Sequence, residues 1–436
     1  MAHLWGMKCT VFKFGGASVR DAKRIKNMAN ILAKQNHKKL VLVVSAMGKN
    51  TNLLEQYVQA YRKSKKSLNS NLVEFADKHY EVGRALGLKT KDLEKKYTKL
   101  IADCSAILKA HKSTPAFVYD QIVSLGELFS TILIEAYLAS AGVKTAWLDV
   151  RKVLKTDGRH REGKVDFKKT ARLVSKKVKA LTAKADIIVT QGFIGGAQNG
   201  TTTTLGREGS DYTAAILAYA LDVAELTIWK DVQGILTADP RRFENVELLE
   251  KLSYREAVEM TYYGAQVIHP KTIQPIQNKR IKLNVRSFVD TSKSGTTIAD
   301  YGLLNYPPIV VIQDEVILIQ ITSNDFSFIS ENHMGFIFEQ LSKHQIKLCA
   351  MRNSAVSFTI CVRLISDATF EAFLKSIGKQ FTVEITRGLQ LMTVRHFTKN
   401  LIASLTQNKV LMFEERLKDT VQLVLKDALE LKEKVS

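Results

Sequence analysis

The chain has 436 residues, of which 45% are hydrophobic and 25% charged, a composition typical of soluble globular proteins with two or three domains. Six prolines and 23 glycines exclude a collagen-like or low-complexity chain. Lysine and arginine outnumber aspartate and glutamate by 64 to 43, and the resulting net charge of +21 suits nucleic acid, an anionic membrane or small anionic substrates.

Cysteine usage and hydropathy indicate the compartment. The cysteines, Cys9, Cys104, Cys349 and Cys361, form no CxxC pair and lie near no histidine cluster, so reduced thiols are expected rather than disulfides or a zinc site. Apolar stretches such as Val41–Met47 fall short of the roughly 20 residues that cross a bilayer, and no signal core opens the chain. A cytoplasmic protein without a membrane partner is predicted.

Strands and helices alternate through the first 300 residues. Strands are predicted at Cys9–Lys13, Lys39–Ser45, Lys144–Asp149, Asp186–Gln191 and Glu225–Lys230. A helix is expected from Asp21 onward, and a Lys-rich helical region over 53–112. This alternation is typical of a three-layer αβα domain with a mostly parallel sheet, in which ligands bind at the carboxyl ends of the strands.

The pattern changes near residue 300. The polar segment Asp290–Thr296 and the break at Pro307-Pro308 predict a boundary between a domain of residues 1–300 and a second region, 301–436. In the second region, strands are expected at Val316–Thr322, Ile346–Met351, Ser357–Leu364, Val383–Thr386 and Leu389–Val394, with two later strands, and helices at Gly335–His344, Phe370–Ile377 and Thr398–Gln407. This order fits two βαββαβ-like units, and so an α+β ferredoxin-like fold.

A glycine pair follows the first predicted strand, in the segment Lys13–Val19 (KFGGASV). Gly15 and Gly16 allow backbone N–H groups to approach an anion ahead of a helix, and Lys13 supplies a mobile positive charge. The alternative is an ordinary strand–helix turn with a surface lysine. The segment is not a Walker A loop, because no GxxxxGK[ST] pattern occurs.

Two further segments combine polar groups with glycine. Ser45–Asn52 (SAMGKNTN) leaves the second strand with hydroxyl and amide groups suited to a polar substrate, or with Thr51 or Asn52 as a helix N-cap. Ser124–Glu127 (SLGE) places a carboxylate in an apolar stretch, where burial without a partner is unfavourable. A substrate ammonium group would offset this penalty; an internal salt bridge or a plain helix-start glutamate is the alternative.

The densest polar cluster is Thr201–Asp211 (TTTTLGREGSD), which precedes a predicted helix. Arg207 can hold a carboxylate through two parallel hydrogen bonds, and Ser210 with the free N–H groups of the helix start can hold anionic oxygens. Asp211 can orient a cation or cap the helix. A capping loop alone would not need Arg207 and both glycines, so a functional role is favoured.

The last candidate binding segment is Ile228–Arg241 (IWKDVQGILTADPR). It has the character of a nucleotide pocket wall, with Arg241 available to a phosphate. Asp239-Pro240 is equally a plain turn signal.

Taken together, these motifs resemble the aspartate kinases of the amino-acid kinase family. KFGGASV, VVSAMGKNTN, SLGE, LGREGSDYTAA, WKDVQGILTADPR and YGAQVIHPKT occur in the family's order and cover about 10–298. The tail resembles, more loosely, the paired ACT regulatory domains that follow this kinase domain. The resemblance implies ATP-dependent phosphorylation of the side-chain carboxylate of L-aspartate, with Mg²⁺ carried by the nucleotide, and a homodimer or larger assembly paired through ACT sheet edges.

The resemblance also implies residue roles. Lys13 and Asp211 would be catalytic: Lys13 would stabilise charge on the transferred phosphoryl group, and Asp211 would organise Lys13 and the substrate. Glu127 would hold the substrate ammonium and Arg207 its α-carboxylate. The remaining substrate positions would be Ser45, Ala46, Thr51 and Ser210. ATP would be bound by Gly15, Gly16, Ser18, Lys230, Asp231, Leu236, Arg241, Gln266 and Val267.

The sequence departs from the family pattern at several positions. Lys230 occupies a position where the family commonly has threonine. Leu236 occupies one where an aromatic residue is common, and Gln266 one where lysine is common. These substitutions redistribute the expected ATP contacts. In the tail, Arg352-Asn353 replaces a Ser-Glu pair and Asn332 a glycine at positions that shape the inhibitor pocket. Lysine inhibition is therefore not implied.

Three alternatives remain. A kinase for another carboxylate, such as acetylglutamate, keeps the fold but offers Glu127 no ammonium partner. A nucleic-acid-binding protein would use the net charge and the lysines of 63–66 and 91–99, yet aromatic residues are not interleaved there and no RRM, KH or zinc signature occurs. A catalytically inactive amino-acid sensor would bind its ligand without turnover. The presence of Lys13 and Asp211 argues against this alternative. No nucleic-acid partner is predicted.

Overall fold

The computed structural model describes residues 9–35, 38–111, 114–265, 268–325, 327–364 and 366–427. Contacts divide the chain into two compact units. The first comprises Met1–Ile235, Leu248–Val258 and Val267–Leu303, and the second comprises Leu236–Glu247, Glu259–Gln266 and Leu304–Ser436. Two short segments from the first 300 residues thus belong to the second unit.

The first unit is built on an eight-stranded sheet in the order β3-β4-β2-β1-β7-β9-β10-β8. Its strands are β1 (Cys9–Phe14), β2 (Lys39–Val44), β3 (Thr145–Leu148), β4 (Ile187–Gln191), β7 (Glu225–Lys230), β8 (Lys251–Ser253), β9 (Lys282–Ser287) and β10 (Thr296–Ala299). The pairings in the described residues are parallel, apart from the antiparallel pairing of β9 with β10. The apolar side chains of β2 are 0% exposed, because helices cover both faces of this part of the sheet.

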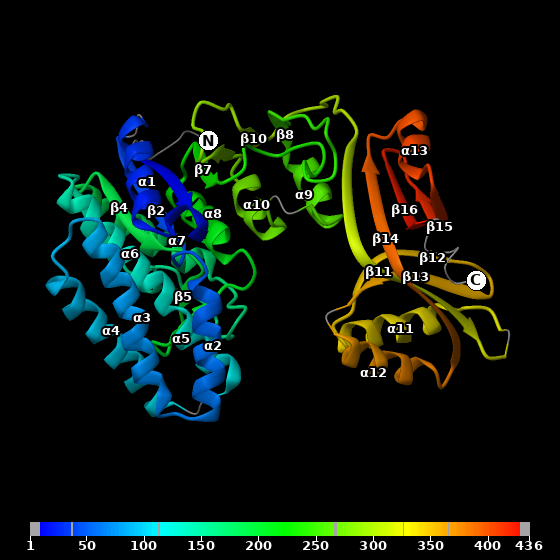
Figure 1. Ribbon diagram of the computed structural model, residues 1–436, viewed down its shortest axis with the longest axis horizontal. Helices are drawn as coiled ribbons and strands as arrows, with labels where there is room; N and C mark the ends of the chain where they lie inside the picture. The colour runs from blue at the N-terminus through cyan, green and yellow to red at the C-terminus, as the bar shows by residue number, and fades with distance from the viewer. Residues whose placement is uncertain are drawn as a thin grey trace. The chain divides into compact units, whose positions relative to one another are not determined.

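The helices of the first unit pack on this sheet and on one another (Figure 1). They are α1 (Ala22–Lys34), α2 (Asn50–Lys63), α3 (Ser67–Ala85), α4 (Lys91–Ala110), α5 (Pro115–Val123), α6 (Leu125–Ser140), α7 (Phe167–Thr182), α8 (Gly209–Leu221) and α10 (Pro270–Gln277); α9 (Tyr254–Tyr262) contributes residues to both units. α6 packs on β2, β3 and β4, and α8 on β1, β2 and β7. A hairpin of β5 (Ile194–Gly196) and β6 (Thr202–Thr204) follows β4.

The helical region predicted over 53–112 consists of the three helices α2, α3 and α4. The chain leaves α3 where Gly87 adopts φ +82° and Leu88 N donates a hydrogen bond to Gly83 O. The run Pro115–Ser140 is long and apolar enough to resemble a membrane span, and 78% of its most apolar window is buried inside the protein. The expectation that every apolar stretch falls short of a membrane span therefore does not hold for the length and composition of this run.

The second unit contains a six-stranded antiparallel sheet in the order β12-β13-β11-β14-β16-β15 (Figure 1). Its elements are β11 (Ile309–Ser323), α11 (Glu331–Lys343), β12 (Lys347–Asn353), β13 (Ser357–Arg363), α12 (Asp367–Ile377), β14 (Phe381–Arg395), α13 (Lys399–Thr406), β15 (Lys409–Arg416) and β16 (Thr420–Asp427). The predicted fold class, a mostly parallel α/β domain with a C-terminal α+β region, is confirmed.

Strands β11 and β14 join the two predicted βαββαβ-like units. The sequence suggested a break between Thr386 and Leu389, but β14 continues through Gly388, which adopts φ +70°. The pairing with β11 changes register near Gln313 and Val316, where Glu315 adopts φ +55°. A bulge therefore absorbs the irregularity without ending either strand.

Candidate functional site

Lys13 lies in the centre of the parallel sheet, on β1 between β2 and β7. Its side chain is 9% exposed, and its Nζ lies 2.5 Å from Asp211 Oδ1 in the first turn of α8. A Cβ added at Gly15 would lie 3.4 Å from Lys13 Nζ, so the ammonium group lies beside the glycine pair. The fold thus brings together two residues that the sequence singled out separately.

Asp211 also pairs with Lys230, at the carboxyl end of β7, across 3.5 Å. Burial raises the pKa of Asp211, but the ammonium groups of Lys13 and Lys230 outweigh that effect and hold it below its ordinary value. The alternative that Asp211 caps α8 is wrong, because Glu208 occupies the N-cap position. Two cations around one carboxylate leave an excess of positive charge here, which suits a phosphate.

The loops that follow β1 and β2 are in direct contact. Gly48 N donates a hydrogen bond to Gly16 O at 2.9 Å, and a Cβ at Gly16 would lie 2.5 Å from Ala46 O. Helix α2 begins at Asn50 after Lys49, with no side-chain cap, so the alternative that Thr51 or Asn52 is the N-cap is wrong. Ser18, in the short 3₁₀ turn after the glycines, is buried.

Glu127 is buried beneath the second of these loops. It lies in the first turn of α6, is 2% exposed, and accepts a hydrogen bond at Oε1 from Ala46 N at 3.2 Å. Its Oε2 is buried and has no hydrogen-bond partner among the described residues. Burial raises the pKa of Glu127 to about 8, although the Ala46 N–H opposes the shift. The predicted alternative of an internal salt bridge is absent from the described residues, and an ammonium group would satisfy the unpartnered oxygen.

Arg207 lies in the loop between β6 and α8. Its side chain is exposed and makes no hydrogen bond or ion pair with any residue the structure describes. Ser210 follows in the first turn of α8, and Gly192 packs on it so closely that a Cβ there would lie 2.6 Å from Ser210 Cβ. Ser45 lies beyond the end of β2, where its carbonyl accepts a hydrogen bond from Ser130 Oγ at 2.9 Å.

The residues that resembled an ATP site are assigned to both units. Lys230 ends β7 in the first unit and the exposed Asp231 follows it, whereas Leu236 and Arg241 belong to the second unit. Arg241 is not free, since its guanidinium donates two hydrogen bonds to Asp239, at 3.0 and 2.7 Å, within the Asp-Pro turn. Gln266 and Val267 lie outside the described residues.

Sequence analysis missed two features that shape this region. One is Gly192, whose signal is a glycine directly after a predicted strand. The other is the buried pair Asp120 and Gln121 on α5, 0% and 3% exposed. Their signal was the same as that of Glu127, namely polar side chains within an apolar helix.

Comparisons with known proteins show the family of this chain. Residues 8–287 match the model of the amino acid kinase family. The chain is similar to lysine-sensitive aspartokinase 3 of Escherichia coli (strain K12), 30% identical over 396 residues that cover 88% of this chain and 86% of that protein. It is also similar to chloroplastic bifunctional aspartokinase/homoserine dehydrogenase 1 of Zea mays, 34% identical over 66% of this chain but only 32% of that protein. The chain therefore spans about a third of the length of such bifunctional relatives.

Solved structures extend the similarity to the whole chain. E. coli aspartokinase III in complex with lysine and aspartate (T-state) superposes with a TM-score of 0.81, at 26% identity, over 98% of both chains. The same protein in complex with aspartate and ADP (R-state) gives a TM-score of 0.79, at the same identity and coverage.

Proposed function

The chain belongs to the amino acid kinase family and, within it, to the aspartokinases, and on this premise we propose that it transfers the γ-phosphoryl group of ATP to the side-chain carboxylate of L-aspartate. The product would be 4-phospho-L-aspartate, which feeds the synthesis of lysine, threonine and methionine. The observation that carries the proposal is the buried pair of Lys13 and Asp211, with the partly exposed Lys230 beside it, in the same unit as Glu127, whose Oε2 lacks a partner among the described residues.

The reaction requires the protein to stabilise negative charge rather than to transfer a proton. The aspartate side chain, with an ordinary pKa near 4, is ionised at pH 7 and needs no general base. It attacks the γ-phosphorus, the bond to the β-phosphate oxygen breaks, and ADP leaves with the electron pair. Lys13 stabilises the charge on the transferred group, and Asp211 holds the Lys13 ammonium in place at 2.5 Å.

Recognition of a free amino acid needs one partner for the ammonium and one for the α-carboxylate. Glu127 would take the ammonium at its unpartnered Oε2, and the exposed guanidinium of Arg207 would take the carboxylate in two parallel hydrogen bonds. Ser45, Ala46, Thr51 and Ser210 would complete the pocket. An N-acetylated substrate would leave Glu127 buried without a cation, which favours aspartate over acetylglutamate.

ATP would lie along the loop of Gly15, Gly16 and Ser18, with Lys230 and Asp231 at the end of β7. Leu236, Arg241, Gln266 and Val267 remain proposed contacts. Magnesium would be held mainly by the ATP phosphates and by water, and it would neutralise part of the phosphate charge.

We also propose that residues 1–300 form the catalytic domain and 301–436 a regulatory region of two ACT-like units. Such a region pairs through its sheet edges, so a cytoplasmic homodimer or larger homo-oligomer is expected. The proposal includes no nucleic-acid or membrane partner.

The test is an ADP-release assay on the full chain with ATP and Mg²⁺, offering aspartate, glutamate and N-acetylglutamate in turn, with and without added lysine or threonine. Aspartate should support turnover and N-acetylglutamate should not. Turnover with N-acetylglutamate and none with aspartate would show that the protein is a kinase for the alternative substrate. Binding of aspartate without ADP release would instead favour the inactive sensor.

A further inference from the structure

We infer that Asp120 is a positioning residue that holds the Arg207 loop at a fixed place relative to Glu127, and so sets the affinity for the amino-acid substrate. The inference rests on the proposed function, in which these two side chains bind opposite ends of the substrate backbone.

Asp120 is a fully buried carboxylate on α5 that three groups satisfy. Thr204 Oγ1 donates to its Oδ1 at 2.7 Å, while Arg161 N and His160 Nδ1 lie 3.0 and 2.9 Å from its Oδ2. A carboxylate is retained in a dry environment only when such donors compensate for its lost hydration. These donors come from two separate segments of the chain, so Asp120 joins both to α5.

Both segments border the Arg207 loop. Thr204 ends β6, and the chain then passes through Leu205 and Gly206 to Arg207. On the other side, a Cβ at Gly206 would lie 3.4 Å from Arg161 O, and Gly163 N donates to Thr204 O at 2.9 Å. Gly206 adopts φ +77°, a left-handed conformation that glycine reaches because it has no Cβ.

Asp120 and Glu127 stand on one helical run. Only Ser124 separates α5 from α6, and Ser124 serves as the end of one helix and the start of the other. The bond from Asp120 to Thr204 therefore links the element that carries Glu127 to the strand that leads to Arg207. The distance between the ammonium site and the carboxylate site is set through this link.

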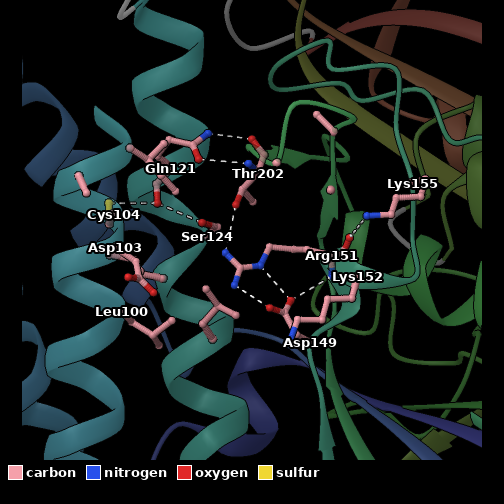
Figure 2. A pocket seen from close by; sticks show the side chains of 17 residues that line it. Leu100, Asp103, Cys104, Gln121, Ser124, Asp149, Arg151, Lys152, Lys155 and Thr202 are labelled. Carbon is pink, nitrogen blue, oxygen red and sulfur yellow. Dashed lines mark hydrogen bonds and ion pairs between the residues drawn. The ribbon is translucent and has the colours of Figure 1, made fainter. Parts of the chain in front are cut away.

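A second contact holds the same strand from the neighbouring residue of α5. Figure 2 shows Gln121 meeting Thr202, with Nε2 donating to Thr202 O at 2.8 Å and Thr202 N donating to Oε1 at 3.1 Å. Arg151, which also pairs with Asp149 at 2.7 Å, donates to Thr202 Oγ1 at 3.2 Å. Because β6 is held from this side as well, loss of the Asp120 bond should loosen the Arg207 loop without unfolding the hairpin.

The test removes one hydroxyl at two equally buried threonines. Thr204→Val deletes the donor to Asp120, and Thr204→Ser keeps it. The matched control is Thr190→Val on β4, since Thr190 is also 0% exposed and donates to a carbonyl, Leu148 O, at 2.8 Å. Steady-state kinetics with aspartate and ATP varied separately, and amide hydrogen exchange over 205–209, are measured for all four proteins.

Thr204→Val should raise the KM for aspartate about tenfold or more, with kcat and the KM for ATP changed by less than about threefold, because ground state and transition state lose the same contact. Amide exchange over 205–209 should quicken. Thr204→Ser and Thr190→Val should keep the parental KM and exchange. An aspartate KM in Thr204→Val equal to that of Thr190→Val would overturn the inference, as would unchanged exchange. If the parent protein releases no ADP with aspartate, the proposed function fails, and exchange over 205–209 still decides the positioning role.

Discussion

At the residue scale, two buried carboxylates respond in opposite ways to their surroundings. Asp211 lies between Lys13 and Lys230, and their charges keep its pKa low despite burial. Glu127 has a backbone N–H for a partner and no cation, so burial raises its pKa to about 8. Asp211 is therefore ionised and pairs with lysine ammonium groups, whereas Glu127 can pair with an ammonium group supplied by a ligand.

Replacing Lys13 by Met should lower kcat on the order of 10²–10³-fold and change the KM for aspartate little, because the charge that Lys13 neutralises is greatest in the transition state. Steady-state ADP release measures both constants. Lys39→Met is the matched control: Lys39 is also a β-strand lysine paired with an aspartate, Asp186, at 2.8 Å, but at the surface. An Lys13→Met protein with parental kcat and a raised KM would remove Lys13 from its catalytic role.

The raised pKa of Glu127 predicts a pH dependence. Below about pH 8 the carboxyl group is largely protonated in the free protein and must lose its proton to pair with the substrate ammonium. The kcat/KM for aspartate should therefore rise with pH through about 8, where half of the Glu127 carboxyl groups are ionised, and level off above about pH 9. Glu127→Gln should weaken aspartate binding and abolish the rise. A flat profile in the parent protein would contradict the assignment.

At the element scale, the site depends on how closely the loops after β1 and β2 approach. The contact of Gly16 with Ala46 O and Gly48 O leaves no space for a side chain, and both neighbours are backbone atoms that cannot rotate away. The loops also carry the glycines proposed to bind phosphate and residues proposed to hold aspartate. Displacing either loop should disturb both substrates.

Gly16→Ala should consequently raise the KM for ATP and for aspartate and lower kcat, whereas Gly335→Ala should leave all three constants unchanged. Gly335 lies in α11 with no atom within 4 Å of an added Cβ, so alanine there should stabilise the helix by up to about 1 kcal/mol. Kinetics together with thermal unfolding test the pair. Parental kinetics in Gly16→Ala would show that the loops can separate without consequence.

Several elements could be predicted from sequence and others could not. Strand β2 is a nearly continuous apolar run, and β1 and β7 are short segments of mixed apolar and polar residues. The residues at the carboxyl ends of these strands could be placed at the site by the rule for parallel sheets. The pairing of Lys13 with Asp211 could not be predicted from sequence, because it depends on β1 lying beside β7 and on where α8 begins. The role of Asp120 was hidden for the same reason: its partners are distant in sequence. The division of the chain was also hidden, since the segments 236–247 and 259–266 join the second unit through contacts that no composition change marks.

At the scale of the whole molecule, the six-stranded sheet ends at two edge strands, β12 and β15. Apolar side chains stay exposed there, with Met351 45% and Leu411 46% exposed. Unpaired edges with exposed apolar groups favour association with a second copy. The excess of positive charge on the chain is consistent with two anionic substrates.

A homodimer or larger assembly is therefore expected for the full chain at micromolar concentration. Light scattering coupled to size-exclusion chromatography should give at least twice the single-chain mass of 48.9 kDa. A mass of one chain in a sample with full activity would exclude pairing as a requirement for function.

The central claim is that this chain makes an acyl phosphate on the side chain of aspartate, and trapping that product tests it most directly. Hydroxylamine converts an acyl phosphate to a stable hydroxamate, which mass spectrometry identifies and locates. With ATP, Mg²⁺ and aspartate, the parent protein should yield the side-chain hydroxamate in step with ADP, and Lys13→Met should yield almost none. ADP formed without any aspartyl hydroxamate, or no ADP at all, would contradict the account.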